Sequence, residues 1–123
     1  MTLTEFLLAR IAEDEKFAQK ARGEGSGEWA SWNRSWDETP NRDLAVDGVR
    51  VATLPMWLDE HACRHDPARV LADCEAKRQM LGLLEADVAD PRNALRRDWA
   101  AEILRGMGSV YANHPDYRQE WRP

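Results

Sequence analysis

The stretch "HACRHD", residues 61–66, gathers residue types that could carry out chemistry. His61, Cys63 and His65 offer the nitrogen and sulfur atoms that zinc prefers, and Asp66 follows directly. On a helix, however, residues two apart point about 200° away from each other, so His61 and Cys63 would diverge. His61 and His65 could share a face, but no further ligand follows at a spacing typical of zinc sites. We therefore expect no metal and no cofactor, and a small metal-dependent hydrolase built on His61, His65 and Asp66 is the alternative.

Other catalytic signatures are missing from the sequence. No serine stands in a nucleophile elbow, and neither a GxxxxGK[ST] phosphate loop nor a dinucleotide fingerprint occurs. Cys63 and Cys74 form no CxxC pair, so two reduced, buried thiols are expected. These observations predict that the protein is not an enzyme.

Three arginines, Arg92, Arg96 and Arg97, could form a basic patch, but acidic residues surround them. The chain carries 17 Lys and Arg against 22 Asp and Glu, and its net charge is −5. Such a balance gives no overall attraction to DNA, RNA or anionic lipid. We do not expect nucleic-acid binding, and a weak nucleic-acid binder that uses these arginines is the second alternative.

Tryptophan is abundant, with six residues among 123, and three of them lie within eight positions. Tryptophan is favoured at partner interfaces, although it also fills small cores. Core, partner surface and ligand platform all stay open for this cluster. The candidate partner-binding residues are Trp29, Trp32, Trp36, Tyr117 and Trp121. We expect a protein partner, with self-association as a further option.

The elements that must position these residues suggest one domain over residues 1–123. Residues 1–22 read as a helix, because Thr2 and Glu5 have the spacing of a capping box and "GEGSG" then ends the pattern. Residues 23–54 form an acidic, tryptophan-rich segment with a β-hairpin turning at Asp47-Gly48. In the hairpin, residue 46 should pair with 49 and residue 44 with 51, which places four apolar side chains on one face.

Residues 55–123 form a helical region with a C-terminal tail. A short helix near Pro55 precedes a long one that begins at Asp66-Pro67, and Asp90-Pro91 has the same form of helix start. In that last helix an apolar stripe runs through residues 95, 99 and 103 and continues to 107. The expected fold class is α+β, mostly α, with three main helices and one β-hairpin packed against them.

Targeting and membrane signals are also missing. No apolar run approaches the ~20 residues of a membrane helix, and the start lacks the form of a secretory signal. We expect a cytoplasmic protein without membrane association.

The strings "HDPARVLADCEAKR" and "HPDYRQEW", together with the opening "MTLTEFLLARIAEDE", resemble a family of short actinobacterial and actinophage proteins of unknown function. The resemblance implies a small soluble protein in a mobile, often phage-borne context, and it implies no activity. Together with the missing catalytic signatures, it predicts a non-enzymatic accessory or interaction protein that binds a protein partner.

Overall fold

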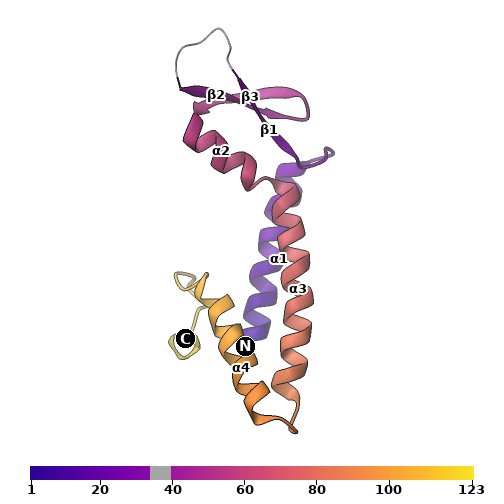
Figure 1. The fold of residues 1–123 in the computed structure, drawn as a ribbon, viewed down its shortest axis with the longest axis vertical. Coiled ribbons are helices and arrows are strands. Elements are labelled where there is room, and N and C mark those ends of the chain that lie inside the picture. The colour runs from indigo at the N-terminus through magenta and orange to yellow at the C-terminus, as the bar shows by residue number, and fades with distance from the viewer. Residues whose placement is uncertain (34–39) are drawn as a thin grey trace. The chain divides into compact units, whose positions relative to one another are not determined.

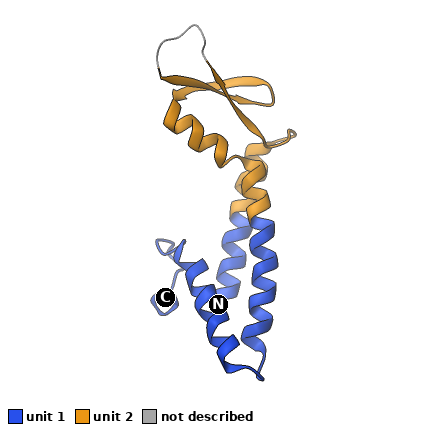
Figure 2. Ribbon diagram, in the orientation of Figure 1, with its two compact units in different colours: residues 1–13, 74–123 blue, residues 14–73 orange. Residues whose placement is uncertain are grey.

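The computed structural model describes residues 1–33 and 40–123 (Figure 1). The chain divides into two compact units: residues 1–13 with 74–123, and residues 14–73 (Figure 2). The helices are α1 (Leu3–Arg22), α2 (Met56–Arg64), α3 (Pro67–Ala89) and α4 (Ala94–Ser109), with a 3₁₀ turn η1 (Gln119–Trp121) near the end. The strands are β1 (Trp29–Asn33), β2 (Asn41–Val46) and β3 (Val49–Pro55).

The expected class, α+β and mostly α, is confirmed. Three long helices and one short helix occur in the described part of the chain, in the expected order. The sheet has one strand more than a hairpin: β1 pairs with β2, and the strand order is β1-β2-β3 with all pairs antiparallel. In the unit of residues 14–73, α2 packs against all three strands, so the sheet does not stand alone (Figure 1).

The hairpin turns where the sequence predicts. Asp47 and Gly48 have φ values of 50° and 77°, and a tight two-residue turn of this kind requires positive φ at both positions. Val46 pairs with Val49 as expected.

The next predicted pair of the hairpin is wrong. Leu44 pairs with Ala52 rather than Val51, because a β-bulge shifts the register between Leu44 and Ala45. The extra residue of the bulge is Val51 on β3, which stands between the partners of Leu44 and Ala45. Leu44 and Ala45 are both buried. Val51 is left 57% exposed, so the valines do not form the single covered face that we expected.

The start of α3 is fixed by Asp66, as predicted. One carboxylate oxygen accepts the backbone N–H of Arg69 at 3.0 Å, and the other accepts the N–H of Trp29 at 3.1 Å. The carbonyl of Gly27 accepts the N–H of Ala68 at 3.0 Å. Any side chain at Gly27 would meet that same nitrogen at 2.9 Å, so this approach of two backbones needs glycine. These bonds tie the first residues of β1 to the first turn of α3 within one unit.

The start of α1 carries the predicted capping box. The N–H of Thr2 donates to the Glu5 carboxylate at 2.7 Å, and the N–H of Glu5 donates to the Thr2 hydroxyl at 3.1 Å. On the inner face of this helix, Leu7 and Ile11 are each 1% exposed.

An aromatic cluster around Phe6 forms much of the core of the unit made by residues 1–13 and 74–123. Phe6 itself is fully buried. Four rings from the end of the chain have centroids 5.1 to 6.2 Å from that of Phe6: Tyr111, His114, Tyr117 and Trp121. Arg10 also contacts the imidazole of His114. The tail after α4 is therefore anchored in this core by aromatic side chains.

The start of α4 differs from the prediction. Asp90 does not cap it; the helix begins at Ala94, and the side chain of Asn93 accepts the N–H of Arg96 at 3.0 Å. Asp90 instead accepts the N–H of Arg92 in the turn before the helix, at 2.9 Å. Both residue types are good caps, and the one nearer the helix is used.

Candidate partner-binding surface

The helix α4 has two different apolar faces. Its buried face consists of Ala100, Leu104 and Gly108. The stripe that the sequence predicts, through residues 95, 99 and 103, lies elsewhere: Leu95 is 59% exposed, Trp99 64% and Ile103 48%. The apolar stripe that the sequence shows is therefore exposed over these three residues.

Small residues explain which face of α4 packs inward. A side chain added at Gly108 would meet the side chain of Leu3 at 3.0 Å and that of Tyr117 at 3.7 Å. The helix therefore comes close to its neighbours at Ala100 and Gly108, with Leu104 buried between them, and Leu95, Trp99 and Ile103 stay outside.

The exposed side chains form one narrow seam. With about 100° of rotation per residue, Leu95, Trp99, Ile103 and Val110 fall within about 80° of one another. Val110, which is 75% exposed, continues the helical geometry directly after α4. We call these four residues the α4 seam. Single exposed apolar residues are ordinary, but a contiguous apolar row is a feature of interaction surfaces.

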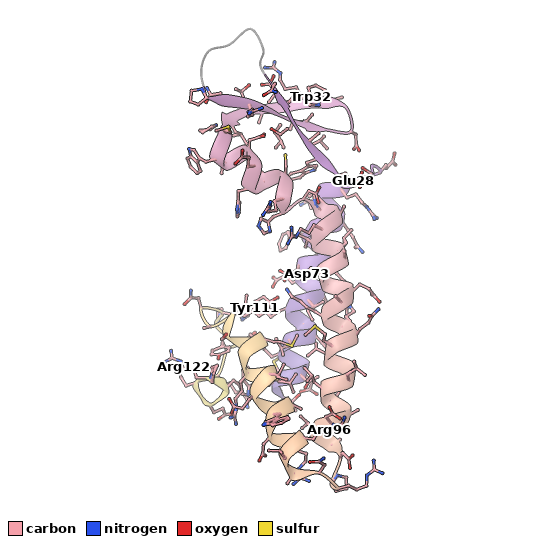
Figure 3. The ribbon with its side chains drawn as sticks, in the orientation of Figure 1. Glu28, Trp32, Asp73, Arg96, Tyr111 and Arg122 are labelled. Atoms are coloured by element: carbon pink, nitrogen blue, oxygen red, sulfur yellow. The ribbon has the colours of Figure 1, made fainter. Side chains whose placement is uncertain are left out.

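Charged residues border the α4 seam with opposite signs on its two sides. By the same rotation, Arg96 lies on one edge, and Glu102 and Asp98 lie on the other, with Arg105 just beyond them. Arg96 is near Asp87 at 3.5 Å (Figure 3), and Glu102 pairs with Arg105 at 2.6 Å. These exposed ion pairs contribute little free energy, so Arg96 and Glu102 could form ion pairs with another chain at low cost.

The clustered tryptophans lie in the other unit, where their surroundings differ from one residue to the next. Trp29 is half-buried, and its indole nitrogen has no hydrogen-bond partner among the described residues. Trp32 lies on β1 and is 42% exposed (Figure 3). Trp36 lies outside the described residues. Of this cluster, Trp32 is the side chain that a partner could reach.

The two aromatic residues of the tail are core residues. Tyr117 is 8% exposed and Trp121 is 7% exposed, and their ring centroids lie 5.9 Å apart. The string "HPDYRQEW" thus has a structural role in its own unit, and the surface that a partner could reach is made by other residues.

The residues from His61 to Asp66 lie at the end of α2. The rings of His61 and His65 stack with centroids 4.6 Å apart. Both oxygens of Asp66 are used by backbone N–H groups. Burial, followed by the charges of Asp59 and Asp66, raises the pKa of the Cys63 thiol. Within residues 1–33 and 40–123, no three His, Cys, Asp or Glu side chains are grouped as a metal site requires.

A hollow of about 820 Å³ lies beside α2 in the same unit. It is lined by Ser31, Trp57, Glu60, His61, Cys63 and Arg64. Its walls combine an exposed indole with both charge signs, without a buried polar group that would orient a ligand.

The three arginines that could form a basic patch have local partners in the turn between α3 and α4. Arg92 donates two hydrogen bonds to the Asp90 carboxylate, at 2.9 and 3.0 Å, which raises the pKa of Arg92 and lowers that of Asp90. Arg97 donates to the Asp90 carbonyl at 3.2 Å. The arginines thus order the turn between α3 and α4.

A match to a protein family covers the whole chain. The model of a family of unknown function, DUF6221, matches residues 1–123. The chain belongs to the DUF6221 family. No curated protein and no solved structure matches this DUF6221 chain.

The described helices of the DUF6221 chain also bear on membrane association. None of them combines the length and the apolar character that crossing a bilayer requires.

The apolar stripe of the sequence contains three of the four residues of the α4 seam, with Met107 in place of Val110, but it does not reveal that they are exposed. The spacing of four between residues 95, 99 and 103 is visible in the sequence, and so are the small residues Ala100 and Gly108 on the other side. A helix with a large apolar row and a small-residue row has two possible inner faces. The contrast between the two rows is the signal that could have identified the exposed one.

Proposed function

We propose that this DUF6221 chain is a non-enzymatic accessory protein that binds a protein partner through the α4 seam. The observation that carries the proposal is the exposure of Leu95, Trp99 and Ile103 along one side of a helix whose other side is already packed. Exposed apolar rows with polar borders are typical of protein interaction sites. Tryptophan is also among the residues that dominate binding energy at such sites.

The borders of the seam indicate what kind of surface would fit. The partner should present apolar side chains at its centre and both charge signs at its rim, because the seam has Arg96 on one edge and Glu102 on the other. An accessory role in a phage-borne setting is part of the proposal and is supported by the sequence resemblance alone. Trp32, at 42% exposure, is a further contact candidate in the other unit.

Affinity capture from an extract of the native cells tests the proposal. The tagged chain is compared with Trp99→Glu and with a matched control, Leu83→Glu. Leu83 is 72% exposed on α3 and lies outside the seam. We expect the wild type and the control to retain the same proteins and Trp99→Glu to lose them. Identical capture by all three chains would refute a role for the seam.

A further inference from the structure

We infer that the partner of the α4 seam is a second copy of this chain, with the two α4 helices running parallel about a two-fold axis. The inference rests on the proposed function and gives it a specific occupant. It follows from the shape of the seam and from the signs of the charges beside it.

The shape of the seam suits a pair of helices. Its side chains follow each other at spacings of four, four and seven residues and stay within about 80° on the helix. Rows of side chains at i, i+4 spacing form ridges that interdigitate where two helices cross, so the seam could be buried between two copies of α4. In a symmetric parallel pair, Trp99 would face its own copy, with Leu95 and Ile103 one turn before and after it.

The borders of the seam favour the parallel arrangement. In a parallel two-fold pair, the edge that carries Arg96 in one helix faces the opposite edge of the other helix. Arg96 then lies across from Asp98 and Glu102 of the second copy. In an antiparallel two-fold pair, each edge faces its own copy, and acidic residues would face acidic residues. Opposite charges across an interface favour association, and like charges oppose it. The charge pattern of the seam is therefore self-complementary in one orientation.

The size of the seam sets the expected strength of the pairing. Four partly exposed apolar side chains provide on the order of a few hundred Å² per chain, less than the ~800 Å² per partner of a standard interface. We therefore expect association in the micromolar range rather than a permanent dimer.

Sedimentation equilibrium between about 1 and 300 μM covers this range of affinity. We expect the wild-type mass to rise toward twice that of the chain, and Trp99→Glu to stay monomeric. Leu83→Glu, outside the seam, should behave as the wild type does. A wild type that stays monomeric at the highest concentration would overturn the inference. In that case, loss of capture by Trp99→Glu would still support the proposed function with a different partner.

Charge reversal tests the orientation of the pair. Arg96→Glu and Glu102→Arg should each weaken self-association at least tenfold, because each places like charges across both borders. Mixing these two variants should restore association in part, since both pairs between positions 96 and 102 are then attractive, while Asp98 of one chain still opposes the carboxylate introduced at position 96 of the other. The double variant R96E/E102R should also restore it. Reversals that leave association unchanged, or a mixture that stays monomeric while the wild type dimerises, would contradict the parallel arrangement.

The charge-reversal variants must be as stably folded as the wild type for this comparison to report on association. Arg96 and Glu102 also have ion-pair partners within their own chain, Asp87 and Arg105. Thermal unfolding of each variant at low concentration, where every chain is monomeric, shows whether the reversal has altered the fold. Because mixing restores association without changing either chain, rescue by mixing cannot result from a folding effect.

Discussion

At the scale of single residues, two buried carboxylates in α2 and at the start of α3 have opposite surroundings. Asp66 gives each of its oxygens to a backbone N–H, which links β1 to α3. Asp59 is completely buried, and neither of its oxygens has a hydrogen-bond partner among the described residues. The first should stabilise its unit, and the second should oppose folding, since burying an unpaired polar group costs free energy.

The capping role of Asp66 is tested by Asp66→Ala. We expect the free energy of unfolding to fall by about 2 kcal/mol, because a cap alone is worth about 1 kcal/mol and a second backbone N–H loses its acceptor as well. The matched control is Asn93→Ala, which removes only the single cap bond of α4. Urea unfolding of both variants measures the difference. Equal losses would show that the bond to Trp29 contributes nothing.

The cost of burying Asp59 is tested by Asp59→Leu, which replaces the two unpaired oxygens by methyl groups of similar shape. We expect the variant to be more stable by about 1 kcal/mol or more, since an apolar side chain carries no desolvation cost at a buried site. Glu60→Gln, at the neighbouring exposed position of α2, should change stability by less than about 0.5 kcal/mol. A destabilised Asp59→Leu variant would mean that the buried carboxyl group is stabilised by a partner in the folded chain.

At the scale of elements, helix ends and the hairpin turn could be predicted because local chemistry determines them. Thr2 with Glu5, Asp66 with Pro67, and Asp47-Gly48 all act where the sequence indicates. In each case a side chain or a glycine satisfies a local backbone requirement, so few distant contacts are involved.

The elements that sequence reasoning missed depend on packing between distant segments. The spacing of the tryptophans in "WASWN" fits a strand or a helix, and pairing with β2 makes it a strand. The bulge in the hairpin inserts Val51 into β3 between the partners of Leu44 and Ala45, and an alternating pattern of valines predicts a regular register instead. The inner face of α4 is chosen by close approach to Leu3 at Gly108, and a glycine adds no apolar signal to the sequence.

The capping box of α1 predicts a pH dependence. The backbone N–H of Thr2, helped by the positive N-terminus and the Thr2 hydroxyl, lowers the pKa of Glu5 below the usual 4.5. A carboxyl whose pKa is lower in the folded state stabilises the fold above its ordinary pKa. That contribution is lost as the pH falls through the lowered value. The wild type should therefore be more stable than Glu5→Gln at pH 7, and the difference should vanish in acid. Thermal unfolding of both chains between pH 2 and pH 7 measures it, and a difference that stays constant with pH would contradict a role for the Glu5 charge.

At the scale of the whole molecule, the candidate site was predicted only in part. The abundance of tryptophan left core and surface roles open. Tyr117 and Trp121 are buried, and among the described residues the most exposed indoles are those of Trp57 and Trp99. Whether an aromatic residue lies in the core or at the surface depends on which neighbours the folded chain supplies. Those neighbours come from distant parts of the chain, so the spacing of the aromatic residues does not reveal them.

We propose that a second protein chain covers the α4 seam in the cell. Hydroxyl-radical footprinting of Trp99 tests this proposal most directly. Oxidation of Trp99 is compared between dilute purified chain and chain expressed at its native level in cells. Trp57, which is 72% exposed in the other unit, serves as the internal reference. We predict strong oxidation of Trp99 in dilute solution and protection by several-fold in cells, with Trp57 oxidised in both. Equal oxidation of Trp99 in the two samples would contradict the claim.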